Sequence, residues 1–116
     1  MVEITHYRVF YYGGLERPKA PASQYQYHRR AIIYLSSDKK VDGKDVQGHI
    51  SFWDRLDIPN YQDCWAEDDD MVYFDIHLHV DHFRNVLELF RREKSVEISR
   101  SAWQNVIQGE QSAVGK

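Results

Sequence analysis

The sequence predicts an α+β fold, and three observations support that prediction. Apolar and polar residues alternate along much of the first eighty positions, which is typical of β-strands with one buried face. Every even position from 72 to 80 is apolar, whereas the odd positions from 73 to 81 hold tyrosine, histidine or aspartate. The apolar spacing then changes to three and four residues over 82–93, which predicts an amphipathic helix directly after that strand.

Three strands are expected in the first half of the chain, over residues 4–12, 27–36 and 47–54. A loop over 15–24 separates the first strand from the second, because it contains prolines and has no apolar period. Asp42-Gly43 is a typical turn dipeptide between the second and third strands. We therefore expect these two strands to form a hairpin whose long polar tip covers residues 37–46.

The helix over 82–93 has suitable residues at both ends. Asp81 precedes it and is placed to cap its first free amide groups. Arg91 and Arg92 lie in its last turn, where the helix dipole favours cations. Glu88 stands four residues before Arg92, in the orientation that favours an ion pair along a helix.

The C-terminal part adds a strand and a second helix. Residues 95–100 alternate between polar and apolar again, which predicts a fifth strand. Ser101 and Gln104 match a capping box, so we expect a short helix over 101–108 that stops at Gly109.

Together these elements predict one compact domain over residues 1–109, with residues 110–116 as a frayed tail. The order β-β-β-β-α-β-α favours a mainly antiparallel sheet of about five strands with two helices packed on one face, because one helical layer covers one apolar sheet face. The other face is then partly wet, which suits its tyrosines and histidines. A β-sandwich or a half-open barrel is the alternative.

The composition of the 116 residues limits the location and the partners of the protein. Cys64 is the only cysteine, so no internal disulfide can form, which fits a reducing compartment. No apolar run is long enough to cross a membrane and the amino terminus lacks a secretory signal, so we expect a cytoplasmic protein with no membrane partner. Residues 54–81 hold nine acidic side chains and one basic one, Arg55. Nucleic acid is an unlikely partner, because its binding needs clustered lysine and arginine.

A candidate metal site follows from the alternation over 73–81. His77 and His79 should project from the same side of one strand, with Asp75 and Asp81 at either end. Imidazole is a common ligand of transition metals such as zinc, and a zinc site would need one or two further ligands. Three histidines on other predicted strands could supply them: His6, His28 and His49. The same pattern also fits the ordinary solvent face of a strand, with no cofactor.

The residues from His77 to His82 resemble the His-x-His-x-Asp-His signature of the metallo-β-lactamase family. The resemblance implies a two-metal hydrolytic centre in which His77 and His79 hold one metal, and Asp81 and His82 hold the other. It covers six residues, and no histidine follows His82 to complete the centre. The chain is therefore not assigned to that family.

Aromatic and acidic residues suggest a surface for a protein partner. Tyrosine and tryptophan are enriched at interfaces, and acidic groups speed the encounter with a basic partner. The residues expected to contact a partner are Tyr61, Trp65, Glu67, Asp68, Asp69, Asp70 and Tyr73. The sequence contains no nucleophile motif or phosphate-binding loop. We therefore expect a non-enzymatic binding module that self-associates as a homodimer or binds a basic protein. The alternative is a metal-binding protein or metal-dependent enzyme centred on His77 and His79.

Overall fold

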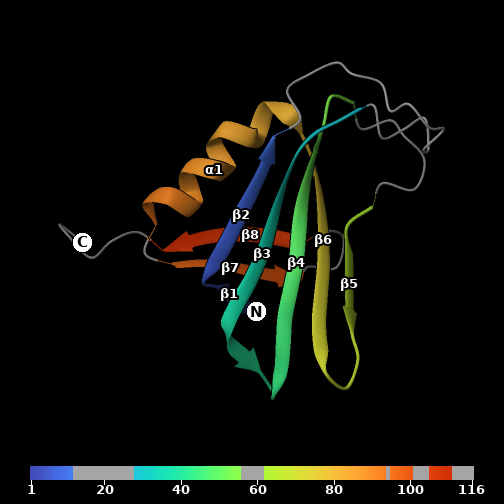
Figure 1. Cartoon of the computed structure of the whole chain (residues 1–116), viewed down its shortest axis with the longest axis vertical. Coiled ribbons are helices and arrows are strands. Elements are labelled where there is room, and N and C mark those ends of the chain that lie inside the picture. The colour runs from blue at the N-terminus through green and yellow to red at the C-terminus, as the bar shows by residue number, and fades with distance from the viewer. Residues whose placement is uncertain (12–27, 56–61, 94, 101–104, 111–116) are drawn as a thin grey trace.

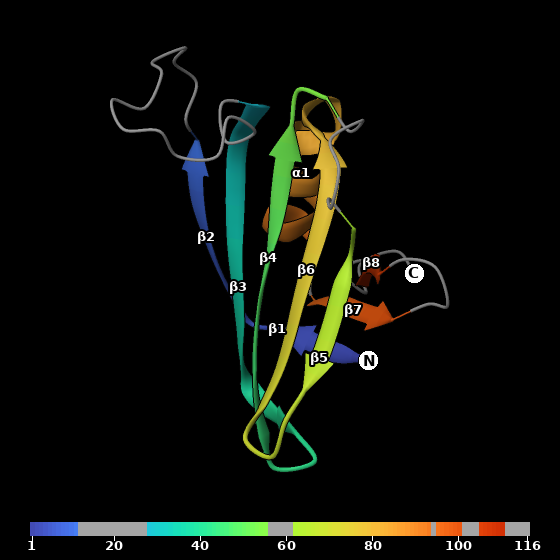
Figure 2. The same cartoon turned by 90° about the vertical axis from the view of Figure 1, so that its right-hand side faces the viewer.

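The chain forms two β-sheets and one α-helix (Figure 1). The structure is a computed structural model that describes residues 1–11, 28–55, 62–93, 95–100 and 105–110, with the backbone alone for Ser95 and 105–110. The large sheet has five strands in the order β2-β3-β4-β6-β5, and the small sheet has the order β1-β7-β8. The strands β2 and β5 are therefore the two edges of the large sheet (Figure 2).

The elements of the large sheet are β2 (His6–Tyr11), β3 (Arg29–Val41), β4 (Lys44–Trp53), β5 (Cys64–Glu67) and β6 (Met71–His79). The small sheet consists of β1 (Val2–Ile4), β7 (Ser95–Arg100) and β8 (Asn105–Glu110). A 3₁₀ turn, η2 (Val80–His82), leads from β6 into α1 (Phe83–Arg92). Within the described ranges, no helix is long and apolar enough to span a membrane.

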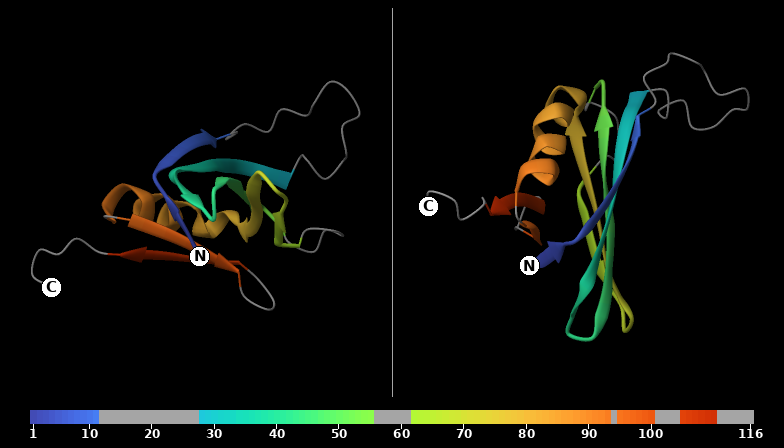
Figure 3. Two further views of the ribbon diagram at one scale, coloured as in Figure 1. Left: turned by 90° about the horizontal axis from the view of Figure 1, so that it is seen from below. Right: turned by 60° about the vertical axis from the view of Figure 1, so that its left-hand side comes forward.

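One face of the large sheet is covered by α1 and the small sheet (Figure 3). We call this the inner face, and the opposite one the outer face. Ile33, Ile50 and Ile76 come from three adjacent strands and are at most 1% exposed. They belong to one apolar cluster together with Phe90 of α1 and Ile98 of β7. The core therefore lies between the inner face and the layer that covers it.

The α+β prediction is confirmed in its coarser form. The large sheet has five strands, as expected, but it is mixed: β6 is parallel to β4, and the other neighbouring pairs are antiparallel. A small second sheet accompanies it, and the large sheet does not close into a barrel within the described residues. The predicted alternation is confirmed along β6, where Val72, Phe74 and Ile76 are buried and Leu78 is partly buried, but it ends before Val80, which lies in η2.

The strand β5 was missed by the sequence analysis and explains the parallel pair. It has four residues and runs into an acidic segment that resembles a loop. That segment is the turn of a β5–β6 hairpin, in which the Asp68 carboxylate accepts hydrogen bonds from the backbone N of Asp70 (2.8 Å) and of Met71 (2.7 Å). The hairpin inserts β6 between β4 and β5, so β6 runs in the same direction as β4.

The β3–β4 hairpin is confirmed, but the prediction of a long polar tip is wrong. The two strands continue to Val41 and from Lys44, so only Asp42 and Gly43 form the turn. Both turn residues have positive φ, 52° and 78°, which fits a two-residue type I′ turn. The pairing of β3 with β4 reaches this turn across an irregularity, because the register shifts between Ser37 and Val41.

The expected first strand over 4–12 is divided at Thr5 into β1 and β2. β1 pairs with β7 in the small sheet, whereas β2 pairs with β3 in the large one. The backbone N of Thr5 donates to the carbonyl of Ser36 (3.1 Å), which holds the chain where it changes sheets. The strand pattern was thus correct, but its two halves belong to different sheets: Val2 and Ile4 of β1 are buried, whereas every residue of β2 is exposed.

Two predictions for the helices are wrong. The predicted second helix over 101–108 is wrong, because residues 105–110 form β8 and pair with β7 along its whole length. Residues 101–104 lie outside the described part of the chain. Val106 and Ile107 are β-branched residues that suit such a ladder. Asp81 does not cap α1, since it lies inside η2, and the N-cap residue His82 makes no side-chain capping bond. The ion pair of Glu88 with Arg92 is confirmed at 2.7 Å.

Gly48 offers a test of how β4 and β6 pack. A Cβ atom at this position would lie 2.5 Å from the ring of Phe74, which is fully buried and stacked on Trp65 with ring centroids 5.7 Å apart. We predict that Gly48→Ala lowers the free energy of unfolding by ~2 kcal/mol, because the ring has little room to move. Urea denaturation measures this change.

The matched control is the same substitution in a Phe74→Leu background. The smaller side chain leaves space for the new methyl group, so the cost of Gly48→Ala should shrink there. An equal cost in both backgrounds would show that contact with Phe74 is not the cause.

Candidate functional site

The outer face gathers the polar residues that the sequence singled out. The parallel register of β4 and β6 places His49 beside Asp75, Ser51 beside His77, and Trp53 beside His79. Side chains alternate across a strand, so the members of these three pairs all project from the outer face. The apolar residues between them point into the core.

The first group of contacts is centred on His77. Trp53 is 3% exposed and its Nε1 donates to His77 Nδ1 (3.1 Å), while the backbone N of His77 donates to the Asp63 carboxylate (2.9 Å). Because Nδ1 accepts this bond, the network assigns the proton of the neutral ring to Nε2. Burial lowers the pKa of His77, against the opposing charges of Asp63 and Asp75. The ring is therefore held in its neutral form.

The second group is centred on His49. Its Nε2 lies 3.1 Å from Asp75 Oδ1, and its Nδ1 lies 3.2 Å from the Tyr73 hydroxyl. Burial lowers the pKa of His49, although Asp75 acts in the opposite direction. Burial, together with a hydrogen bond to Asp75 and its charge, raises the pKa of Tyr73 far above its ordinary value of 10.

The polar groups around His49 contact one another within the protein. The hydroxyl of Tyr73 stays protonated, so it cannot serve as a nucleophile near neutral pH. Both ring nitrogens of His49 face polar partners within the protein. The cluster instead fixes the side chains of β4 and β6 in one arrangement.

Three candidate metal ligands, Asp75, His77 and His79, share this face, whereas Asp81 lies in η2, and the described part of the chain forms no metal centre from them. No group of three or more histidine, cysteine, aspartate or glutamate residues suited to a metal is found there. His79 uses both ring nitrogens: Nε2 donates to the carbonyl of Asp54 (3.1 Å), and Nδ1 accepts from the backbone N of Asp81 (3.1 Å). Binding of zinc by His77 and His79 stays a hypothesis, and it would require these bonds to break.

The residues predicted to contact a partner are divided between different surfaces. Asp68, Asp69 and Asp70 are exposed in the β5–β6 turn, and Tyr61 lies outside the described residues. Trp65 and Glu67 belong to the inner-face side of β5, because they pair with Phe74 and Val72. Tyr73 lies on the outer face, within the His49 cluster. The sheet itself therefore separates Trp65 from Tyr73.

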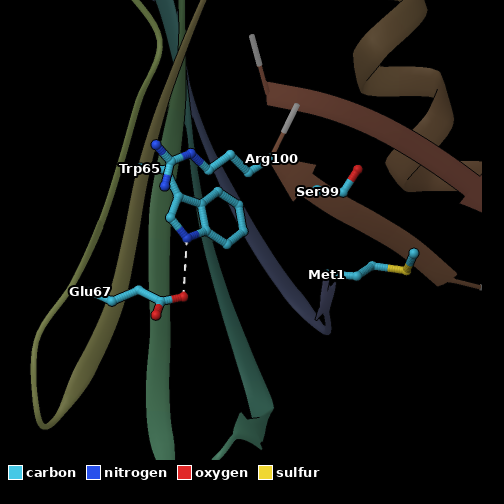
Figure 4. Close-up of a pocket in the computed structure, with 5 residues that line it drawn as sticks. All are labelled: Met1, Trp65, Glu67, Ser99 and Arg100. Atoms are coloured by element: carbon cyan, nitrogen blue, oxygen red, sulfur yellow. Dashed lines mark hydrogen bonds between the residues drawn. The ribbon is translucent and has the colours of Figure 1, made fainter. Parts of the chain in front are cut away.

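Trp65 and Glu67 line an open hollow between β5 and the small sheet (Figure 4). Its volume is about 380 Å³, and its other lining residues are Met1, Ser99 and Arg100. Trp65 Nε1 donates to Glu67 (3.2 Å), and Lys44 Nζ lies 3.8 Å from the same carboxylate. The polar groups of this wall are thus engaged within the protein.

The strand β2 carries exposed apolar and aromatic residues that the sequence analysis did not assign to a candidate site. All six of its residues are exposed, and they include Tyr7, Val9, Phe10 and Tyr11. The rings are held in place: Tyr7 packs on Phe90 with centroids 5.4 Å apart. The alternation of the strand was visible in the sequence, but its position at the sheet edge was not.

Comparisons of the chain with protein-family models, with curated proteins and with solved structures gave no match.

The buried hydroxyl of Ser51 gives a test of the outer face. Ser51 is 1% exposed, and among the described residues its Oγ has no hydrogen-bond partner. An unsatisfied buried hydroxyl costs about 1–3 kcal/mol, so Ser51→Ala should leave the free energy of unfolding unchanged or raise it. Ser51→Val adds volume at the same site and serves as the comparison. A loss of about 1 kcal/mol in the alanine variant would reveal a partner for the hydroxyl.

The lowered pKa of His49 predicts a pH-dependent stability. Below the ordinary histidine pKa of 6.5, the unfolded chain takes up a proton that the native chain resists. The free energy of unfolding should therefore fall as the pH drops below 6.5, and level off once the native residue is also protonated. Urea midpoints measured from pH 8 to pH 5 follow this change.

His49→Gln keeps an amide donor towards Asp75 but does not titrate, so the fall between pH 8 and pH 5 should be smaller than in the wild type. His82→Gln, an exposed position at the start of α1, is the control and should leave the dependence unchanged. Equal slopes for wild type and His49→Gln would contradict the assignment.

Proposed function

We propose that the protein is a non-enzymatic binding module that forms a homodimer through antiparallel pairing of β2 with the β2 strand of a second copy. The observation that carries the proposal is the state of this edge. Within the described part of the chain, β2 pairs only with β3, so its other side presents backbone donors and acceptors. Every residue of the strand is exposed.

Among the described residues, the edge at β2 has little of the usual protection against pairing, with Arg8 as its one arginine or lysine. Natural edge strands are short, or carry lysine, proline or bulges. The other edge, β5, has four residues and runs directly into the acidic turn at 68–70. β2 has six residues without lysine or proline, its register with β3 is unbroken, and four of its side chains are large and apolar or aromatic. Such an exposed apolar edge supports a role in association.

The strand is complementary to itself in one register. A two-fold axis perpendicular to the sheet would continue both sheets into one and place opposite residues on the same face. If the axis passes through Val9, then Arg8 faces the partner's Phe10, and Tyr7 faces the partner's Tyr11. Arg8 already lies over the ring of Phe10 within one chain, 4.9 Å from its centroid.

The neighbouring register is disfavoured. An axis through Arg8 would place two guanidinium groups directly opposite each other, and like charges in that position are destabilising. The Val9 register instead forms two cation–π contacts and two aromatic pairs. The charge pattern of the strand therefore favours the Val9 register over the Arg8 register. One short strand pair buries a modest area, so we expect a reversible dimer whose population depends on concentration.

Light scattering along a dilution series tests the proposal. The wild type should have the mass of two chains when concentrated and approach one chain on dilution, with no change on adding a chelator. Val9→Lys places two ammonium groups at the axis and should weaken the dimer by at least about tenfold, roughly the effect of 1.4 kcal/mol. Val9→Thr keeps a β-branched side chain and should dimerise nearly as well as the wild type.

Ala66→Lys introduces the same charge on the opposite edge, β5, and is the matched control; it should leave the dimer intact. Wild-type protein with the mass of one chain at every concentration would overturn the proposal. So would an effect of Ala66→Lys as large as that of Val9→Lys. Loss of the dimer with chelator would favour the metal-binding alternative.

A further inference from the structure

A groove on the outer face has features of a ligand site, and it shares Tyr7 and Arg8 of β2 with the proposed dimer contact. Its volume is about 390 Å³, within the range of small-molecule sites. It crosses three adjacent strands, and its lining residues are His6, Tyr7, Arg8, Tyr34, Leu35, Ser36 and Gln47.

The register of the strands explains why polar side chains meet in this groove. One row across the sheet contains His6, Ser36 and Gln47, which are consecutive partners on β2, β3 and β4. The next row contains Arg8 and Tyr34. All five lie on the outer face, because their positions share the parity that places Tyr34 beside His49. The groove is therefore lined by regular strands and not by loops.

The groove carries a cation, Arg8, for which the described residues supply no carboxylate partner. In the described part of the chain, the contact given for the Arg8 guanidinium is the ring of Phe10, and no carboxylate lies within ion-pair distance of it. His6, by contrast, is engaged with Asp38 at 2.8 Å. An arginine with a free fork of donors is suited to an oxyanion.

Neutral hydrogen-bonding groups surround this cation. The side-chain hydroxyl of Ser36, the amide of Gln47 and the hydroxyl of Tyr34 make no hydrogen bond to other described residues. Tyr34 is 41% exposed, but its ring is fixed between Phe10 and His49, with centroids 5.5 and 5.9 Å away. A held aromatic ring beside an anion-binding group provides a surface for an apolar or planar part of a ligand.

We propose that this groove binds a small phosphate monoester, with its phosphate on Arg8, Ser36 and Gln47 and its apolar portion against Tyr34. The number of donors favours phosphate over carboxylate. A carboxylate has two oxygens, which a single arginine can satisfy, whereas the three terminal oxygens of a phosphate monoester can also accept from the hydroxyl and the amide. The outer position of these residues leaves the groove open to solvent.

Calorimetric titrations with inorganic phosphate, phenyl phosphate and benzoate test this inference, with light scattering on the same samples. Phenyl phosphate should bind saturably with one site per chain, and more tightly than inorganic phosphate, because only it contacts Tyr34. Benzoate should bind at least about tenfold more weakly than phenyl phosphate, since it carries fewer acceptor oxygens.

Two variants address the anion contacts from different strands. Arg8→Gln should weaken phenyl phosphate by at least about tenfold, as expected for loss of a charge-assisted hydrogen bond. Gln47→Leu, on β4 and away from the pairing strand, should also weaken it while leaving the mass of the protein unchanged. Lys40→Gln removes an exposed cation at the far end of β3 and is the control, with no change expected.

Absence of saturable phenyl phosphate binding would overturn the inference. An equal loss of affinity in Lys40→Gln and Arg8→Gln would also overturn it, because that result indicates nonspecific attraction of anions. Benzoate binding as tight as phenyl phosphate would reassign the groove to carboxylates and reject the phosphate assignment. Phenyl phosphate binding by a protein that stays monomeric would support the groove and contradict only the dimer.

Discussion

The parallel pairing of β6 with β4 is the constraint on which the rest of the structure depends. It places Ile76 beside Ile50 in the core and, on the reverse side, Asp75 beside His49. A shift of one residue would exchange these faces, burying charged groups and exposing the apolar ones. The pairing therefore determines at once where α1 and the small sheet can pack and which polar residues remain on the outer face.

The outer face combines buried hydrogen bonds with accessible groups at one side. Around β4 and β6 the polar side chains are largely enclosed. Trp53 donates a hydrogen bond to His77, and the Tyr73 hydroxyl contacts His49, which makes this region rigid. Towards β2 the residues become exposed, and Arg8 and Tyr34 are presented to solvent on that rigid support. Preorganised side chains of this kind lose little freedom on binding, so a rigid sheet is a suitable platform for recognition.

The sequence predicted local structure more successfully than long-range arrangement. The alternation of β6, the period of α1 and the Asp42-Gly43 turn were recognised because each is encoded by neighbouring residues. β5 and β8 were missed, since a short strand acquires its conformation from the strand beside it. The His77 and His79 face was predicted correctly as a polar strand face. The exposure of β2 could not be predicted, because the position of a strand in a sheet depends on contacts between distant residues.

Residue-resolved amide exchange of β2 in concentrated and dilute samples tests the central claim most directly. Amide groups of this strand that point away from β3 are bonded only if a second strand adds to the edge. The account predicts that their exchange slows as the protein concentration rises, while amides in the interior ladder of β4 and β6 exchange at the same rate in both samples. Unchanged exchange of the β2 amides across the concentration range would contradict it.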